Sequence, residues 1–332
     1  MWNSINAIRG YLDKNSNQYL YIFVHVPKCA GGTIGRHFAS IYGGKKSLYL
    51  RLTDFISERT SEYSDEELRE NRQIVKTSWI KEYIRTLGDA RRNSIQSIYG
   101  HIAYYGIHEH FNKNHRYFTF LREPVARFIS LYNYMLTIRV TPERLRQSGI
   151  QDEDGRVRSL DEWIKEVNLV SYSMTGFLAQ ICNAEDLLQL GYTPSPQDLI
   201  KVKKMLESFY FVGLTENDDD MQFVYNRLGV NFYKPDKNVL RIKSSYILPS
   251  NMEAARELIL SKYPYEQELY EYAVQLNHEM KSRIKDFEKA VSYTRFRRNI
   301  SKRVNIVLQV GGFYKAFDEK ARHLLGKISP AK

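Results

Sequence analysis

The residues that most clearly suggest chemistry lie together in one short segment near the N-terminus. Gly31 and Gly32 permit a ligand to approach the backbone closely, and they directly precede a stretch with helical spacing. The N–H groups and the dipole of a helix N-terminus favour an anion. Lys28 adds a positive charge and Thr33 adds a hydroxyl. We therefore predict that a phosphate-like group is bound by Lys28, Cys29, Ala30, Gly31, Gly32 and Thr33.

Two common phosphate-binding loops do not match this segment. The Walker A loop requires Gly-x-x-x-x-Gly-Lys-Ser/Thr, whereas here Lys28 precedes the glycines. The Gly-x-Gly-x-x-Gly dinucleotide fingerprint is absent as well. The alternative interpretation is a tight turn between a strand and a helix, but the flanking Pro27-Lys28 and Thr33 favour a binding loop.

Two motifs carry a resemblance to a known family. The segment His25–Thr33, HVPKCAGGT, resembles the 5′-phosphosulfate loop of sulfotransferases. It is closest to sulfotransferase family 2, which contains the uronyl and heparan sulfate 2-O-sulfotransferases. The segment Phe118–Tyr132 is similar to that family's 3′-phosphate motif, in which the matching residues are Arg122 and Ser130. The planar fork of an arginine suits phosphate oxygens. The resemblance implies 3′-phosphoadenosine-5′-phosphosulfate as donor and 3′,5′-adenosine bisphosphate as product.

Weaker matches extend the resemblance over residues 19–275. Phe211–Glu216 resembles a strand that is frequent in the family, and Tyr265–Tyr270 resembles its late helix. In that helix the family's usual Asp would be replaced here by Gln267 or Glu268.

One loop of the family closes over the nucleotide, and residues 234–245 occupy its position. The resemblance implies that Arg241 and Lys243 contribute to donor binding. The least matched regions are residues 44–75 and 136–175, where the family's acceptor selectivity lies. The sequence therefore leaves the acceptor unidentified beyond a hydroxyl, which we expect on a saccharide or glycolipid.

An acceptor hydroxyl needs a general base, and His101 is the leading candidate. It follows a predicted strand, in a segment Tyr99–Gly106 that looks like the Gly-His segment of the uronyl 2-O-sulfotransferases. In those enzymes the histidine of the Gly-His segment acts in catalysis, and the resemblance implies the same role for His101. A neutral imidazole with a pKa near 6.5 suits this role at pH 7. A structural histidine at a strand end is the alternative, and we expect His25 to belong to the core.

Carboxylates and a thiol are the other candidate groups. Asp54 and Glu58 are the nearest acids after the loop, although Glu58 lies in a polar, solvated stretch. Glu123 is expected to orient its neighbour Arg122. A nucleophilic role for Cys29 is conceivable because a helix N-terminus lowers a thiol pKa, but direct transfer needs no nucleophile.

No metal is expected. His108 and His110 lie two residues apart without a cysteine or carboxylate partner pattern, and with His115 they are expected to be structural or solvated. A sulfuryl group carries less negative charge than a phosphoryl group, so Lys28 and backbone amides can stabilise its transfer.

The arrangement of elements predicts an α/β fold with a central parallel sheet flanked by helices and a P-loop-like phosphate-binding strand-loop-helix. Strands are predicted at residues 19–26, 97–101, 117–121 and 209–214. Helices are predicted near residues 34–41, 62–93, 125–132, 160–168, 173–190, 196–208 and 218–228, with two more in 251–289. Residues 140–160 are predicted to form a polar loop.

Composition narrows the class of protein. A hydrophobic fraction of 43% over 332 residues can build a large core. Two cysteines, Cys29 and Cys182, cannot form a disulfide scaffold. The longest apolar run is far shorter than the ~20 residues of a membrane span, and no signal peptide is recognisable. The expected location is cytoplasmic.

The net charge of +11 is concentrated at the C-terminus. Residues 281–332 hold 14 of the 49 basic residues and 4 of the 38 acidic ones, so residues 1–280 are nearly neutral. We predict a sulfotransferase domain over 1–280 and a basic, helical extension over 281–332. The extension could dock on the body, touch an anionic membrane surface or contact an acidic partner or glycan. Nucleic-acid binding is not expected, because no recognition motif accompanies the charge.

The sequence thus predicts an enzyme that moves a sulfuryl group from 3′-phosphoadenosine-5′-phosphosulfate to an acceptor hydroxyl. The alternatives are a catalytically inactive nucleotide- or glycan-binding module and a P-loop phosphotransferase.

Overall fold

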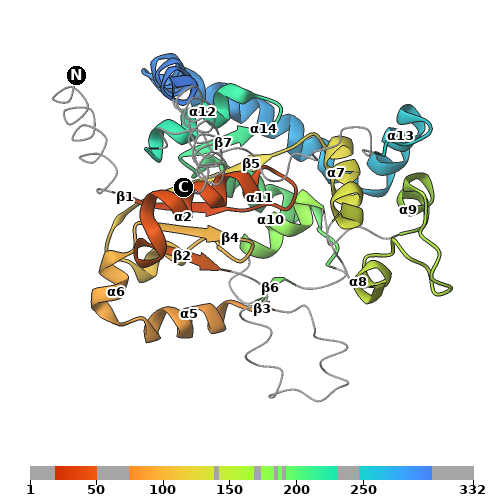
Figure 1. Cartoon of the computed structure of the whole chain (residues 1–332), viewed down its shortest axis with the longest axis horizontal. Helices are drawn as coiled ribbons and strands as arrows, with labels where there is room; N and C mark the ends of the chain where they lie inside the picture. The colour runs from red at the N-terminus through yellow and green to blue at the C-terminus, as the bar shows by residue number, and fades with distance from the viewer. Residues whose placement is uncertain are drawn as a thin grey trace, which may run out of the picture.

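A central sheet of five parallel strands organises the protein (Figure 1). The computed structural model describes residues 19–50, 75–137, 142–167, 173–182, 186–188, 192–229 and 247–300. The strand order is β2-β4-β1-β5-β7. The strands are β1 (Tyr19–Val24), β2 (Ser47–Leu50), β4 (Ser97–Gly100), β5 (Asn114–Leu121) and β7 (Phe211–Leu214). The predicted α/β class with a parallel sheet is confirmed.

Helices pack around the sheet, and a further group of helices lies beside it. In Figure 1, α5 and α6 lie near β2, α12 and α14 lie near β7, and α7, α9 and α13 form a separate group. The helices are α2 (Gly31–Lys46), α5 (Thr77–Thr86), α6 (Gly88–Ser94), α7 (Pro124–Thr137), α8 (Pro142–Gln147), α9 (Leu160–Glu166), α10 (Met174–Cys182), α11 (Pro196–Glu207), α12 (Asp218–Arg227), α13 (Met252–Lys262) and α14 (Pro264–Arg283). A further helix spans residues 287–300.

The sequence of β1 explains its central position. Its residues Leu20 to Val24 are all buried, as expected for a strand covered on both faces. The main hydrophobic core surrounds it. A second core lies between α7, α9 and α13, where Phe128, Trp163 and Ile259 are buried together.

Four elements differ from the sequence-based expectations. The edge strand β2 was not predicted, since four residues with one exposed side chain, Tyr49, give little pattern. Val75–Lys76, placed inside the predicted helix 62–93, forms the short strand β3. It pairs antiparallel with β6 (Asp186–Leu188), which lies inside the predicted helix 173–190, where the observed helix α10 ends at Cys182. The helix α8 lies within the predicted polar loop.

The helix α14 covers the outer edge of β7. Asn277 Nδ2 donates to the carbonyl oxygen of Val212 at 2.7 Å, and the N–H of Val212 lies 3.3 Å from the sulfur of Met280. Both backbone groups of Val212 are therefore paired with side chains of α14 rather than with another strand.

The first part of the basic segment packs on the body. Phe287 and Val291 of the helix over 287–300 are buried in the main core. Arg295 pairs with Asp218 at 2.9 Å, close to the N-terminus of α12. Within the described ranges, no helix combines the length and apolar character that crossing a membrane requires.

Candidate functional site

The predicted site residues converge because of the strand order. β1 lies between β4 and β5, with Val24 paired to Gly100 on one side and to Thr119 on the other. The segments that follow these three strands carry Lys28, His101 and Arg122, and therefore meet at one edge of the sheet. In parallel α/β sheets, the point where strand order reverses is the usual place of a ligand crevice.

The loop between β1 and α2 has an unusual backbone. Lys28 and Ala30 have φ angles of 68° and 60°, in the left-handed region that non-glycine residues rarely adopt. Each such conformation costs about 1–3 kcal/mol, and such residues gather at functional sites. Ala30 precedes α2, and its carbonyl oxygen accepts hydrogen bonds from the N–H groups of Thr33 and Ile34. As an alanine, the N-cap residue Ala30 provides no side-chain cap to α2.

Lys28 and Arg122 place two positive charges beside each other. The guanidinium of Arg122 donates to the carbonyl oxygen of Lys28 at 3.4 Å, and the ammonium of Lys28 lies 3.7 Å from the ring centroid of Tyr134. Burial, with the charge of Arg122, lowers the pKa of Lys28 to about 8. A bound anion would offset both the burial of the Lys28 charge and its repulsion by Arg122. The arrangement therefore favours a multiply charged anionic ligand.

Ser130 lies on α7, and Glu123 directly precedes this helix. Ser130 is half-buried on this helix, about two helical turns after Arg122 along the chain. Glu123 accepts a hydrogen bond from the N–H of Ala126 at 2.7 Å, and it pairs with Arg256 at 3.0 Å. Glu123 therefore caps α7 and anchors α13. The expectation that it orients Arg122 is not supported by these contacts.

His101 is fixed in one tautomer by the backbone of His25. Its Nδ1 lies 2.9 Å from the carbonyl oxygen of His25. A carbonyl can only accept, so Nδ1 carries the proton and Nε2 keeps its lone pair. Burial lowers the pKa of His101 below its usual 6.5, although the hydrogen bond to His25 opposes this. His101 is therefore neutral at pH 7, as a general base must be.

His25 links the glycine loop to His101. Its ring stacks on that of His101 with centroids 4.0 Å apart. On Gly31, a Cβ atom would lie 1.6 Å from Cδ2 of His25, so only a glycine fits there. Burial, the nearby His101 and Lys28 hold the pKa of His25 well below its usual range. The sequence indicated a core residue and gave no sign of this contact, which depends on the turn after β1.

Cys29 is unsuited to a nucleophilic role. Its side chain is fully buried, and burial raises the pKa of its thiol to about 12. The thiolate is the reactive form, so Cys29 is inert at neutral pH.

A buried ion pair behind the loop was missed by the sequence analysis. Arg127 and Glu266 are 0% and 1% exposed, and their nearest charged atoms are 3.7 Å apart. Glu266 also accepts from the N–H groups of Met174 and Thr175 at 2.9 and 2.8 Å and from the Thr175 hydroxyl at 2.9 Å. None of the guanidinium nitrogens of Arg127 has a hydrogen-bond partner among the described residues.

Glu266, not its neighbours, is the buried acid of the late helix. Glu268 pairs with Lys203 at the surface, and Gln267 donates to Glu271 within the helix. The helical spacing of Glu266 with the buried Leu269 and Ala273 was the signal that could have identified it.

Other predicted residues are structural or lie elsewhere. His108 Nδ1 is 3.0 Å from the Tyr117 hydroxyl, and His110 Nε2 is 2.9 Å from the Tyr104 hydroxyl. In the described part of the chain, no three metal-binding side chains cluster. Four candidates lie outside the described residues: Asp54, Glu58, Arg241 and Lys243.

Comparison with known proteins identifies the family. A family model described as the sulfotransferase family matches residues 15–273, well over half of the chain. A comparison with curated protein sequences finds no match. The matched region contains both motifs and all the site residues located above. The chain belongs to the sulfotransferase family.

Proposed function

We propose that this protein transfers a sulfuryl group from 3′-phosphoadenosine-5′-phosphosulfate to a hydroxyl of a carbohydrate acceptor. The observation that carries the proposal is the contact between the Arg122 guanidinium and the backbone of Lys28, which brings Arg122 to the loop that carries Lys28. Family membership supports sulfuryl transfer. The likeness of Tyr99–Gly106 to the uronyl 2-O-sulfotransferases supports a sugar hydroxyl.

The residues present fit such a donor. Lys28 and the N-terminus of α2, with Gly31, Gly32 and Thr33, would hold the 5′-phosphosulfate. Arg122 and Ser130 would hold the 3′-phosphate, which distinguishes this donor from ATP. The donor supplies an activated sulfuryl group attached to a phosphate leaving group.

Two side chains of the protein assist the transfer, one as a base and one by stabilising negative charge. Nε2 of His101 accepts the proton of the acceptor hydroxyl as the new S–O bond forms. The ammonium of Lys28 stabilises the negative charge that remains on the phosphate oxygen when the old S–O bond breaks. No covalent link to the protein is needed.

Calorimetry and a turnover assay test the proposal. We expect 3′,5′-adenosine bisphosphate to bind more tightly than ATP, without a requirement for Mg²⁺. Sulfate transfer to a panel of saccharides and glycolipids should be detected, and Lys28→Ala should abolish it. Tighter, Mg²⁺-dependent binding of ATP would instead indicate a phosphotransferase. Nucleotide binding with no turnover on any acceptor would indicate a binding module.

A further inference from the structure

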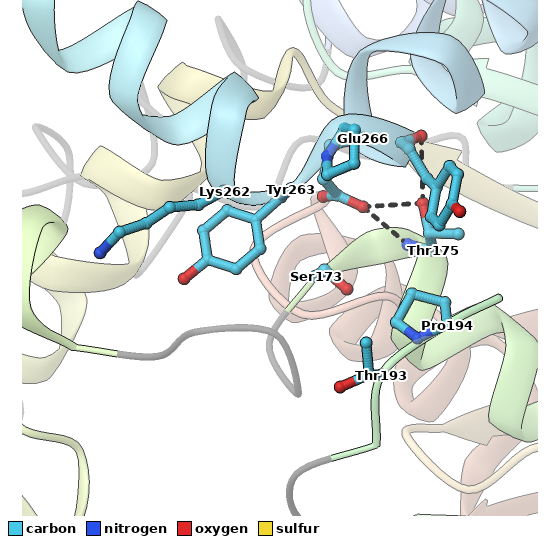
Figure 2. Close-up of a pocket in the computed structure, with 9 residues that line it drawn as sticks. Ser173, Thr175, Thr193, Pro194, Lys262, Tyr263 and Glu266 are labelled. Atoms are coloured by element: carbon cyan, nitrogen blue, oxygen red, sulfur yellow. Dashed lines mark hydrogen bonds between the residues drawn. The ribbon is translucent and has the colours of Figure 1, made fainter.

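A pocket lies where α10 and α14 begin, beside the residues that precede α11. Its volume is about 230 Å³. In Figure 2, Ser173 lies between Tyr263 on one side and Thr193 and Pro194 on the other. The full lining consists of Ser173, Thr175, Thr193, Pro194, Lys262, Tyr263, Pro264, Tyr265 and Glu266.

The two charged residues of this lining are already paired. Glu266 accepts three hydrogen bonds and faces Arg127, as described above. Lys262 extends away from the other labelled residues in Figure 2, and its ammonium donates to the carbonyl oxygens of Ile164, at 2.8 Å, and Lys165. The described lining therefore offers no charge to a ligand, and a charged group would lose its hydration without compensation.

The rest of the lining is suited to an apolar group. Two prolines and two tyrosines provide carbon surface, and such walls with few polar groups are typical of small-molecule pockets. At least three of the hydroxyls are used locally, and that of Tyr263 donates to the carbonyl oxygen of Val167 at 3.5 Å. Ser173 accepts from the N–H of Gly176 at 2.9 Å, and Thr175 donates to Tyr265 or Glu266.

The helix α10 connects this pocket to the candidate base. The ring of Phe177 meets that of His101 edge-to-face, with centroids 6.4 Å apart. The carbonyl oxygen of Ser173 accepts from the N–H of Phe177, so the two residues lie one helical turn apart. A turn rises about 5.4 Å. The pocket lining at Ser173 therefore lies one helical turn from the residue that packs on His101.

We propose that this pocket binds an uncharged apolar part of the acceptor, an aryl or alkyl group attached to the hydroxyl-bearing part. The proposal rests on the proposed function, because it treats His101 as the place of the acceptor hydroxyl. It names the acceptor class more closely: a molecule with a neutral apolar substituent rather than a polyanionic chain.

A binding experiment tests the pocket without turnover. The probe is 4-fluorobenzyl alcohol, followed by ¹⁹F NMR on the full chain. Thr193 is exposed at the pocket, so Thr193→Trp should fill the space and weaken probe binding about tenfold or more. The control is Ile200→Trp, because Ile200 is 57% exposed on the neighbouring helix α11 and does not line the pocket. Absence of binding to the unaltered protein, or equal binding by Thr193→Trp, would overturn the proposal.

Two further experiments test whether the pocket belongs to the acceptor site rather than to the donor site. Saturating 3′,5′-adenosine bisphosphate should leave the probe bound, whereas displacement would assign the pocket to the donor and overturn the proposal. In the transfer assay, phenyl glycosides should show a lower KM than methyl glycosides, and Thr193→Trp should remove this difference while the donor KM is unchanged. If no acceptor is sulfated, the proposed function fails while the NMR result still decides whether the pocket binds apolar groups. If transfer occurs but Thr193→Trp leaves the KM difference intact, the function stands and the pocket assignment fails.

Discussion

The imidazole of His101 is held by the backbone of His25, with Nδ1 2.9 Å from the carbonyl oxygen and the two rings stacked 4.0 Å apart. This relationship joins the ends of neighbouring strands β1 and β4. It sets the tautomer of His101 and places its ring next to the glycine loop. The same two residues therefore determine both the position and the protonation of the candidate base.

A substitution at His101 can keep the hydrogen bond made by Nδ1 while removing the proposed base, Nε2. In His101→Asn the amide can still donate to the carbonyl oxygen of His25, but no atom replaces Nε2. If His101 is the base, kcat should fall by about 10²–10⁴ while binding of 3′,5′-adenosine bisphosphate is preserved. A loss of activity below about tenfold would exclude this role.

The pH dependence of the unaltered protein is a second test of His101. On the acid side, kcat/KM should fall only below pH 6.5, because the base must be neutral and burial lowers the pKa of His101.

The lowered pKa of Lys28 predicts an alkaline limit. The ammonium form is required, and it is lost as pH rises through about 8, so kcat/KM should fall with a midpoint near that value. Bound donor adds negative charge and should shift the corresponding limb of the kcat profile to higher pH. In Lys28→Arg the charge persists at every accessible pH, so the alkaline limb should disappear even if the rate is reduced. Retention of that limb would assign it to another group.

Arg122→Ala should weaken binding only of ligands that carry a 3′-phosphate. Removing a hydrogen bond to a charged group costs about 1.5–3 kcal/mol, which corresponds to roughly a ten- to hundredfold rise in Kd. Calorimetry would compare 3′,5′-adenosine bisphosphate with adenosine 5′-monophosphate, whose affinity should change little. An equal loss for both ligands would contradict the assignment of Arg122 to the 3′-phosphate.

Gly31→Ala tests the contact with His25. At the start of a helix, alanine is ordinarily favoured over glycine by up to about 1 kcal/mol. Here the new Cβ would lie 1.6 Å from the His25 ring, so the ring must move. We expect a destabilisation of about 1–3 kcal/mol and a loss of activity. Adding His25→Ala should restore stability but not activity. A more stable Gly31→Ala single variant would show that His25 does not occupy this position.

Glu266→Gln and Glu268→Gln form a matched pair on α14. Loss of the buried partner of Arg127 should cost about 3–5 kcal/mol in urea unfolding, because it leaves a charge uncompensated in the core. Glu268 is 57% exposed and pairs with Lys203, so its replacement should cost less than about 1 kcal/mol. Similar costs for the two variants would contradict the assignment of Glu266 as the structural acid.

The sequence predicted the parts of the site that depend on local patterns. The strand, glycine turn and helix around Lys28, and the strand end at Arg122, are each encoded within a few neighbouring residues. The apolar run of β1 indicated its burial, so the parallel sheet followed. His101 was identified by resemblance, and the structure places it beside the loop.

Other features depend on contacts between distant segments and left no local signal. Arg127 and Glu266 are 139 positions apart, so their pairing left no local signal, although the helical spacing of Glu266 with Leu269 and Ala273 indicated its burial. The strand β2 is too short to show alternation, and its pairing with β4 includes a hydrogen bond between Ser47 and Ser97. The ion pair of Glu123 with Arg256 joins the start of α7 to α13, and its two residues are 133 positions apart.

The covering of β7 by α14 has a consequence for how the domain can be divided. The family match ends at residue 273, inside α14, before Asn277 and Met280 reach the backbone of Val212. A chain shortened there would leave β7 as an open strand with unpaired backbone groups, which is a template for pairing with a second molecule. Such a fragment should self-associate, whereas one ending after residue 300 should stay monodisperse in light scattering. The domain that folds as a unit therefore extends beyond residue 273, where the family match ends.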